Sequence, residues 1–336
     1  MSAHFASPLS STASFPLGSS TLTALTDCGG SAPAAWMFPA LPPADLELFP
    51  GGRAPLSYGC CLVETPAATL LVDSSVGPPR LNTIDPAFTT KAREQRPLLS
   101  LLAAADVAPE AVTAVVHTHL HRDHHSGNVL GGGGLAFPGA THYVQRGEAE
   151  YWSSTPELRA RSGWDETIRP VEEAGKLRLV DGSLEIAAGV TLRPAGGHTP
   201  GHQVVVVEDP EAGKAYLVGD LLHQTLQVEH RDWSPRFDWD AEKARESREL
   251  VLGEIEREGA RMLSPHFPFP GVGRIEAGKW APGWGAAKPK EAAVEELAAD
   301  PIAFWGAWSM AHDADACRVG EDGVKCSCFE GLGSVM

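Results

Sequence analysis

The segment His119-Leu120-His121-Arg122-Asp123-His124 places four potential metal ligands within six residues. A short apolar and β-branched run, residues 111–116, precedes it and is typical of a buried strand. Loops at strand ends are held by a rigid scaffold, so their side chains can be directed at one point. Imidazoles bind zinc and similar divalent ions, and a carboxylate can complete or bridge such a site. The segment therefore predicts a metal site at the end of this strand.

Three further candidate ligands follow strand-like segments downstream. His198 follows residues 190–194 in the string GHTPGH, Asp220 follows residues 215–219, and His266 follows residues 261–265. Together with the first segment they give five histidines and two aspartates, enough for two metal ions that share one carboxylate. The complete expected ligand set is His119, His121, Asp123, His124, His198, Asp220 and His266.

These separated signals are similar to the pattern of the metallo-β-lactamase superfamily over residues 20–280. The HxHxDH motif, the GHTPGH segment, a Gly-Asp pair after a strand and a final strand-end histidine occur here in the family's order. The resemblance implies an α/β protein with a four-layer αββα sandwich. It also implies the metal assignment: His119, His121 and His198 at one ion, Asp123, His124 and His266 at the second, and Asp220 bridging both.

Residues 219–227 and 264–271 resemble methyl parathion hydrolase and its relatives, a group similar to the dinuclear-zinc quorum-quenching lactonases. The chain differs from these relatives at two places. Residues 73–77 read Asp-Ser-Ser-Val-Gly, where the family more often has Asp-Thr-Gly. His223, three positions after Asp220, stands where the lactonases have a substrate-polarising tyrosine. The fold and metal assignments are independent of both differences, whereas the choice of substrate is not.

The resemblance implies two zinc ions, or another pair of divalent transition metals, with a bridging hydroxide as nucleophile. Such metals lower the pKa of water toward 7, so no serine or cysteine nucleophile is needed. We expect a hydrolase of a small neutral ester-like substrate: a lactone or carboxyl ester, with an organophosphate triester as a promiscuous substrate. The expected catalytic residues are Asp123, Asp220 and His223. Two alternatives stay open, a thioesterase resembling glyoxalase II and an iron-dependent redox member of the superfamily.

The charge, the apolar runs and the cysteine content of the chain indicate which partners and which cellular location to expect. The 336 residues carry a net charge of −16, and Arg122 is the one basic residue inside the HxHxDH motif, which weighs against a nucleic-acid partner. No apolar run approaches the roughly 20 residues of a membrane helix. Residues 1–20 contain no Lys or Arg and predict a flexible tail, not a secretory signal. Six cysteines are too sparse for a disulfide scaffold, so we expect a cytoplasmic protein.

The chain divides into three parts. We expect a flexible tail over residues 1–19, a catalytic domain over residues 20–285, and a helical extension with a tail over residues 286–336. An aromatic cluster in the extension could pack on the body of the protein or on the partner subunit of a homodimer; it comprises Phe304, Trp305 and Trp308. The spacing of Cys317, Cys326 and Cys328 matches no common zinc module.

Local patterns predict the main elements of the domain. Strands are expected over residues 22–25, 59–64, 69–72, 203–208 and 215–218, and helices over residues 91–105 and 241–258. In the second helix the apolar residues share one face, Asp240 can cap the start, Gly259 ends it, and the charged positions are expected to face solvent.

Four polar residues outside the ligand set have expected supporting roles. Asp73 is suited to orient a ligand histidine. His117 and His125 are expected to pack in the structure without binding metal, and His202 to hydrogen-bond within the turn that places His198.

The segment 224–240 carries Trp233, Phe237 and Trp239 between Asp220 and the long helix. Aromatic side chains there either line an apolar entrance for an acyl or aryl group or anchor the loop, and the sequence leaves both interpretations open.

Overall fold

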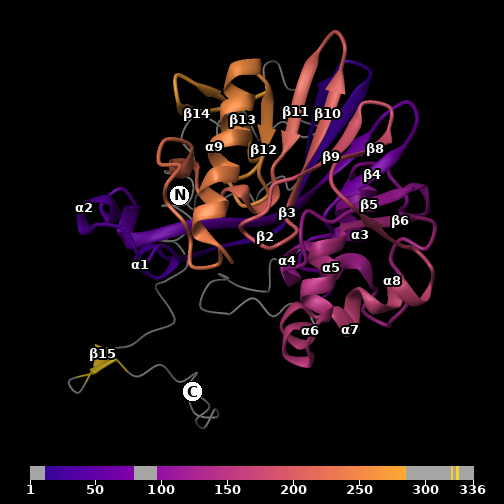
Figure 1. Cartoon of the computed structure of the whole chain (residues 1–336), viewed down its shortest axis with the longest axis horizontal. Helices are drawn as coiled ribbons and strands as arrows, with labels where there is room; N and C mark the ends of the chain where they lie inside the picture. The colour runs from indigo at the N-terminus through magenta and orange to yellow at the C-terminus, as the bar shows by residue number, and fades with distance from the viewer. Residues whose placement is uncertain (1–11, 79–96, 285–318, 321–322, 325–336) are drawn as a thin grey trace, which may run out of the picture.

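The computed structural model describes residues 12–78, 97–284, 319–320 and 323–324 (Figure 1). Its strands are β1 (Thr12–Leu17), β2 (Ser20–Pro33), β3 (Arg53–Glu64), β4 (Thr69–Val72), β5 (Ala114–Val116), β6 (Thr141–Gln145), β7 (Leu177–Val180), β8 (Leu184–Ala187), β9 (Val190–Pro194), β10 (Gln203–Asp209), β11 (Gly213–Leu217), β12 (Arg261–Leu263), β13 (Val272–Glu276), β14 (Lys279–Pro282), β15 (Val319–Gly320) and β16 (Gly323–Val324). Its α-helices are α1 (Ala34–Met37), α2 (Pro43–Leu46), α3 (Leu98–Ala104), α4 (Arg122–His125), α5 (Arg146–Ser153), α6 (Pro156–Ser162), α7 (Trp164–Thr167), α8 (Arg169–Glu173) and α9 (Ala241–Glu258).

Two seven-stranded sheets form the body of the protein. The first has the order β1-β2-β3-β4-β5-β6-β7, antiparallel from β1 to β4 and parallel from β4 to β7. The second has the order β14-β13-β12-β11-β10-β9-β8, and its β11–β12 pair is parallel. Parallel neighbours need a crossover connection, so the chain passes over the outer faces of the sheets between these strands.

The sheets pack face to face, and strand β10 shows how the sequence produces this. Successive side chains of a strand point to opposite faces. Val205 and Val207 therefore lie in the core between the sheets, whereas Val204 and Val206 pack under α9. The run of four valines suits a strand that is buried on both faces.

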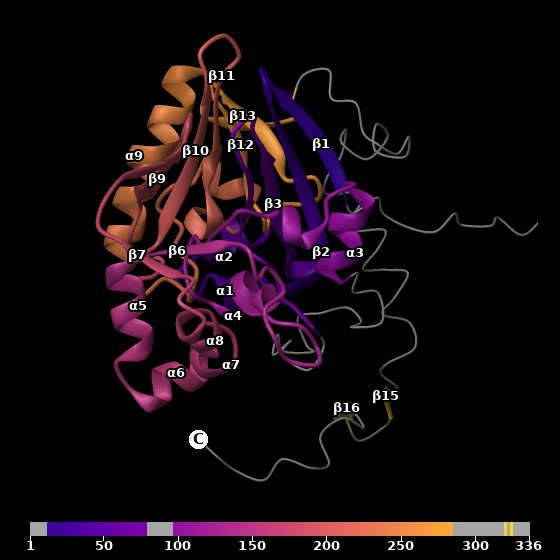
Figure 2. The same cartoon turned by 90° about the vertical axis from the view of Figure 1, so that its right-hand side faces the viewer.

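Helices cover the two outer faces. Figure 2 shows α3 and α9 on opposite sides of the two sheets. Leu101 and Leu102 of α3 pack in one cluster with Leu62 of the first sheet, and Leu252 of α9 packs in the cluster of the second sheet. The order of layers is helix, sheet, sheet, helix, which confirms the expected αββα sandwich.

Helix α9 has the predicted bounds. The Asp240 carboxylate accepts a hydrogen bond from the Lys243 amide (3.0 Å), and Gly259 ends the helix with a left-handed φ of 59°. The expectation that all its charged positions face solvent was wrong for Arg248, which is 1% exposed. Its guanidinium is paired with Asp238 (3.1 Å), and this pairing compensates the burial of both charges.

Other boundaries needed correction. The tail predicted over residues 1–19 contains strand β1, in which Ala13, Phe15 and Leu17 are buried on one face. The strand predicted over residues 111–116 begins only at Ala114, because Pro109–Ala111 forms a 3-10 turn. In the predicted helix 91–105, α3 occupies Leu98–Ala104, and residues 91–96 lie outside the described residues.

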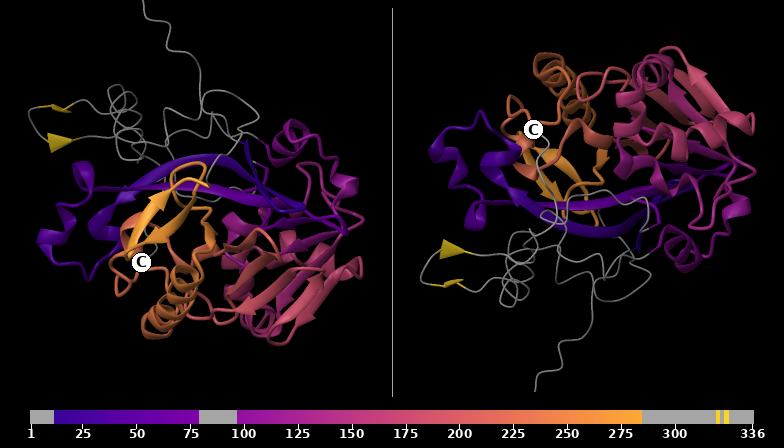
Figure 3. Two further views of the ribbon diagram at one scale, coloured as in Figure 1. Left: turned by 90° about the horizontal axis from the view of Figure 1, so that it is seen from above. Right: turned by 90° about the horizontal axis from the view of Figure 1, so that it is seen from below.

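The predicted strands at residues 22–25 and 59–64 belong to a much longer ribbon. Strand β2 continues to Pro33, and strand β3 already begins at Arg53. The two strands pair along this length, with a bulge between Thr26 and Cys28. Figure 3 shows this indigo ribbon crossing the molecule and carrying α1 and α2 at its end. Phe38, Phe49 and Trp233 pack together there, so the segment after Asp220 is joined to the ribbon.

Within the part of the chain that is described, no helix has the length and apolar character that crossing a membrane requires. The extension predicted from residue 286 onward, with its aromatic cluster and its three cysteines, lies outside the described residues except for the short pair β15–β16.

Candidate metal centre and substrate pocket

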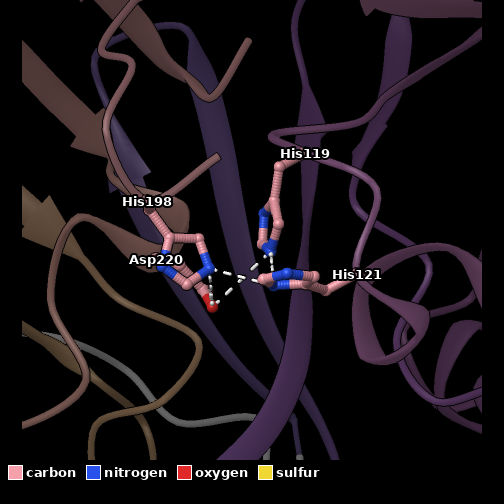
Figure 4. Close-up of side chains that lie close together, drawn as sticks. All are labelled: His119, His121, His198 and Asp220. Carbon is pink, nitrogen blue, oxygen red and sulfur yellow. Dashed lines mark hydrogen bonds and ion pairs between the residues drawn. The ribbon is translucent and has the colours of Figure 1, made fainter. Parts of the chain in front are cut away.

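Four of the predicted ligands converge at one point (Figure 4). His121 Nδ1 lies 3.0 Å from His119 Nε2 and 3.0 Å from His198 Nε2. Asp220 Oδ2 lies 3.6 Å from His119 Nε2 and 3.2 Å from His198 Nε2. A tetrahedral zinc site with bonds of about 2.0–2.1 Å spaces its donor atoms about 3.3 Å apart. The four donors therefore have the spacing of a metal site, which we call the first site.

A second site lies on the other side of Asp220. Asp123 Oδ2 lies 3.6 Å from His124 Nε2 and 3.7 Å from His266 Nε2, and the two imidazole nitrogens are 3.3 Å apart. Asp220 Oδ1 lies 3.0 Å from His124 Nε2 and 3.1 Å from His266 Nε2. Asp220 Oδ1 thus faces both second-site histidines, while Oδ2 faces the first site and also lies 3.2 Å from His266 Nε2. The carboxylate stands between the two groups, as a bridging carboxylate would.

In three of the histidines, the ring nitrogen that points away from the centre (the outer nitrogen) lies beside a hydrogen-bond acceptor. This contact determines whether the nitrogen that points toward the centre (the inner nitrogen) carries a proton or a lone pair. His124 Nδ1 lies 2.8 Å from Asp73 Oδ2, His198 Nδ1 lies 3.0 Å from Asp238 Oδ1, and His266 Nδ1 lies 2.7 Å from the Ser57 carbonyl oxygen. These acceptors favour a proton on the outer nitrogen, so the inner nitrogen presents its lone pair to the centre. Converging lone pairs and carboxylates suit a pair of divalent cations.

The electrostatics divide the ligand histidines into two groups. Burial lowers the pKa of His119 and His121 well below the usual value, so both stay neutral, the form that binds metal. Burial also lowers the pKa of His124, His198 and His266, but Asp220 and neighbouring carboxylates outweigh it and raise these pKa values, that of His198 to about 9. A bound divalent cation would replace the inner proton on each of these rings.

Burial alone would raise the pKa of Asp220, but imidazoles, first among them His124 and His266, outweigh it and hold that pKa well below its usual range. The bridging carboxylate is therefore ionised. Its Oδ1 accepts no hydrogen bond within the described chain.

The fold brings these residues together because every ligand follows the end of a strand. The HxHxDH segment follows β5 of the first sheet, and His198 occupies the turn between β9 and β10 of the second. Asp220 follows β11 and His266 follows β12, and β11 and β12 are parallel neighbours. All seven side chains predicted as ligands lie in the two groups.

A pocket with a volume of about 340 Å³ opens onto this centre. Its polar floor contains ligand residues of both sites together with His223. Apolar walls come from the β2–β3 ribbon and from Phe237. The residues that line it are Ala32, Trp36, Leu56, Tyr58, His121, Arg122, Asp123, Arg161, His198, Asp220, His223, Phe237 and His266.

His223 lies beside both sites. Its Nε2 is 3.2 Å from Asp220 Oδ2, and its ring is stacked on His266 with centroids 5.1 Å apart. The side chain of Gln227 accepts a hydrogen bond from the His223 backbone amide (2.7 Å), which fixes the residue over the floor of the pocket. Asp220, His223 and His266 also lie close enough to hold a metal, so a ligand role for His223 has to be tested.

The remaining histidines have the expected supporting positions. His117 is buried against His142 and Asn128, each at 3.2 Å, and His125 hydrogen-bonds with Thr167 (2.8 Å). His202 bonds to the Ala195 carbonyl oxygen (3.0 Å) within the turn that carries His198 and accepts from the Asp220 amide (3.1 Å).

Two arginines reach the pocket, although the sequence showed only one near the motif. The Arg122 guanidinium is engaged by Glu166 (2.7 Å) and by the carbonyl oxygens of Ala160 and Arg161. The Arg161 guanidinium, from α6, lies 5.9 Å from the centre of the Trp152 ring. No local pattern in the sequence placed α6 beside the HxHxDH segment.

The aromatic segment 224–240 divides between the two roles that the sequence left open. Phe237 lines the pocket, 5.4 Å from Trp36 and 5.6 Å from His223 between ring centroids. Trp233 is 5% exposed within the ribbon cluster and therefore anchors the loop. Trp239 is 51% exposed and is not among the lining residues.

This division predicts different effects for the three aromatic residues. Phe237→Ala should raise KM about tenfold more for long-chain than for short-chain substrates, because each buried methylene contributes about 0.8 kcal/mol. Trp233→Ala should lower the free energy of unfolding by about 3–5 kcal/mol and leave chain-length preference unchanged. Trp239→Ala is the control and should change neither quantity. Steady-state kinetics measures KM, and denaturant unfolding measures the free energy of unfolding. Equal KM effects across chain lengths for Phe237→Ala would contradict the assignment of Phe237 to the pocket wall.

A two-sheet sandwich with seven converging metal donors at the ends of its strands defines a dinuclear metalloprotein of the αββα class. The chain belongs to the metallo-β-lactamase superfamily, since the family model described as "Metallo-beta-lactamase superfamily" matches residues 59–254. Among similar proteins, an N-acyl homoserine lactonase from a Bacillus species is 27% identical over 218 residues, covering 62% of this chain and 78% of the relative. The N-acyl homoserine lactonase AttM from Azorhizobium caulinodans is 33% identical over 184 residues, covering 52% and 66%.

Solved structures share the fold. AidC, described as a dizinc quorum-quenching lactonase in complex with a product, is 22% identical with a TM-score of 0.67, covering 84% of this chain and 99% of its own. The hydrolase AbOPH of the beta lactamase superfamily is 24% identical with a TM-score of 0.69, covering 82% and 99%. Both likenesses establish the fold alone.

Proposed function

We propose that this protein is a metal-dependent hydrolase of lactones or carboxyl esters, with zinc as its native metal pair. The observation that carries the proposal is the position of the Asp220 carboxylate between two groups of histidines, with Oδ1 near His124 and His266 and Oδ2 near His198 and His266. The relatives named as N-acyl homoserine lactonases support a lactone or ester as substrate. The AidC likeness, to a dizinc enzyme, supports zinc.

In the proposed assignment His119, His121 and His198 would hold one metal, Asp123, His124 and His266 would hold the other, and Asp220 would be shared by both. When bound, such a pair supplies Lewis acidity, which polarises an ester carbonyl and makes water nucleophilic near neutral pH.

The residues of the chain would orient the substrate over this centre. Leu56, Trp36 and Phe237 provide apolar surface for an acyl or aryl group. Among the described residues that line the pocket, Tyr58 is the only one with a side-chain hydroxyl, and burial raises its pKa well above the usual value. The phenol therefore stays protonated and can donate a hydrogen bond to a substrate oxygen. His223 is placed to do the same on the side of Asp220.

A substrate panel on metal-loaded protein tests the proposal. We expect kcat/KM for neutral lactones and aryl esters to exceed that for phosphodiesters by several orders of magnitude, because the chain carries a net charge of −16 and repels polyanions. A phosphotriester is expected to be a slower substrate. Removal of metal with a chelator should abolish hydrolysis, and refilling with zinc should restore it.

Other outcomes would redirect the assignment. Preferred cleavage of acyl-glutathione would indicate a thioesterase, and a requirement for iron with redox turnover would indicate the redox branch. Efficient cleavage of RNA would overturn the substrate class while leaving the metal centre intact.

Partners and location complete the proposal. We infer that a small molecule is the only required partner, that neither nucleic acid nor membrane is bound, and that a homodimer is compatible with the chain. A cytoplasmic location is supported by the free thiols of Cys28, Cys60 and Cys61. Light scattering and cell fractionation test these points.

A further inference from the structure

Glu148, on helix α5, is a fully buried carboxylate close to the metal centre that is not itself among the ligands. Its Oε1 accepts hydrogen bonds from the Leu120 amide (2.8 Å) and from Trp152 Nε1 (2.7 Å). Its Oε2 accepts from the Gly201 amide (2.8 Å). Both oxygens are thus committed to fixed donors.

The two backbone donors, the amides of Leu120 and Gly201, lie on the two loops that carry the first-site histidines. Leu120 stands between His119 and His121 in the loop after β5, and Gly201 ends the turn that carries His198. One loop belongs to the first sheet and the other to the second. Glu148 therefore joins, through one carboxylate, the loops that supply all three histidines of the first site.

The contact between α5 and the turn is close enough to require glycine. A Cβ at Gly201 would lie 2.4 Å from the Glu148 backbone nitrogen. The side chain of Trp152, held by Glu148, also stands edge-on to the His121 ring with centroids 5.4 Å apart. Backbone and ring contacts both fix the position of the first-site ligands relative to Glu148.

The second-site histidines are held by other groups. His124 is held by Asp73, and His266 by the Ser57 carbonyl oxygen. Glu148 has no hydrogen bond with any of these residues in the described chain.

We propose that Glu148 is a positioning residue that sets the affinity of the first metal site without setting that of the second. The inference rests on the proposed metal pair but not on the identity of the substrate. Glutamine has nearly the shape of glutamate but offers one acceptor oxygen, and its amide group would face an N–H donor. In Glu148→Gln, one loop therefore loses its hydrogen bond, and the three histidines lose their common spacing.

Metal titration of apo-protein by calorimetry tests this directly, with each site measured alone. A His266→Ala background keeps the first site, and a His121→Ala background keeps the second. Adding Glu148→Gln should raise the zinc Kd about 10–100-fold in the first background, the range known for residues that orient ligands. It should leave the Kd unchanged in the second background.

Three further variants sharpen the result. Trp152→Phe removes one hydrogen bond to Glu148 but keeps both loop contacts, so it should change the first-site Kd much less. Glu148→Asp keeps the charge and should recover part of the affinity. Gly201→Ala displaces the turn without removing the carboxylate and should weaken the first site selectively.

Two results would overturn the proposal. An equal loss of affinity in both backgrounds would show general structural support, and no loss in either would show that Glu148 only packs. Because these titrations use no substrate, they are independent of the substrate panel, whose failure would concern only the proposed reaction.

Discussion

Asp220→Ala is expected to abolish nearly all hydrolytic activity and to reduce the bound metal from two ions per chain. The reason is geometric, since Asp220 lies 3.0–3.6 Å from inner nitrogens on both sides of the centre. Without it, each site loses its shared ligand, and the imidazoles lose the negative charge that compensates two cations. Elemental analysis after dialysis measures the metal, and lactone or aryl ester hydrolysis measures the activity.

A matched control distinguishes the loss of the Asp220 carboxylate from the loss of any carboxylate elsewhere in the protein. Asp181→Ala removes a surface carboxylate that pairs with Arg146 and should retain both metals and full activity. Asp220→Asn keeps the shape of the side chain but removes its charge and should resemble Asp220→Ala. If wild-type protein saturates at one ion and Asp220→Ala stays fully active, the dinuclear proposal is wrong.

His223→Phe is expected to lower kcat by about 10²–10⁴-fold, the usual contribution of a hydrogen-bonding or general acid group. Burial lowers the pKa of His223, so its neutral imidazole contributes a hydrogen bond near pH 7 without a full charge. Phenylalanine preserves the stacking on His266 and removes the ring nitrogens. Metal content should stay at the wild-type level.

The metal measurement distinguishes the two roles that the geometry allows. Loss of one ion in His223→Phe would make His223 a ligand, and unchanged kinetics would assign it to packing. His230→Phe is the control, because His230 is stacked on Trp233 at 4.1 Å and does not line the pocket. It should leave both metal content and kcat unchanged.

The family resemblance implied the sandwich, whereas local signals in the sequence predicted strand β10 and the ends of α9. A strand buried on both faces needs a continuous apolar run, such as the valines at residues 204–207, and a helix of 18 residues shows its cap and its C-terminal glycine directly. Strand β1 was missed because its apolar positions alternate with Ser, Thr and Pro, so its composition resembles that of a tail. The ribbon beyond Thr26 was missed because Cys28, Gly29 and Gly30 carry no strand pattern.

Asp238 and Arg248 illustrate a polar contact that the sequence did not reveal. In sequence, Asp238 is one of several acidic residues in a loop, and Arg248 is one of many charges on α9. In the structure, Asp238 bonds to both His198 and Arg248, and the side chains of Asp238 and Arg248 are buried. Only the packing of the loop against α9 makes this buried ion pair a support for a ligand.

The sequence by itself predicted seven residues as metal donors, and the structure brings all seven into two adjacent groups. Few side chains have lone pairs suited to divalent metals, and they must follow strand ends to converge, so the seven positions carry a specific local signature. Only the tertiary structure decided what surrounds them: the walls from Trp36 and Tyr58, the cation of Arg161, and the carboxylate of Glu148. These residues need only to be apolar, charged or hydrogen-bonding, which many positions satisfy. The long-range pairing of β2 with β3 and the packing of α5 and α6 decide which of these positions lie near the metal donors. Such contacts join residues far apart in the sequence, so no local sequence pattern predicts them.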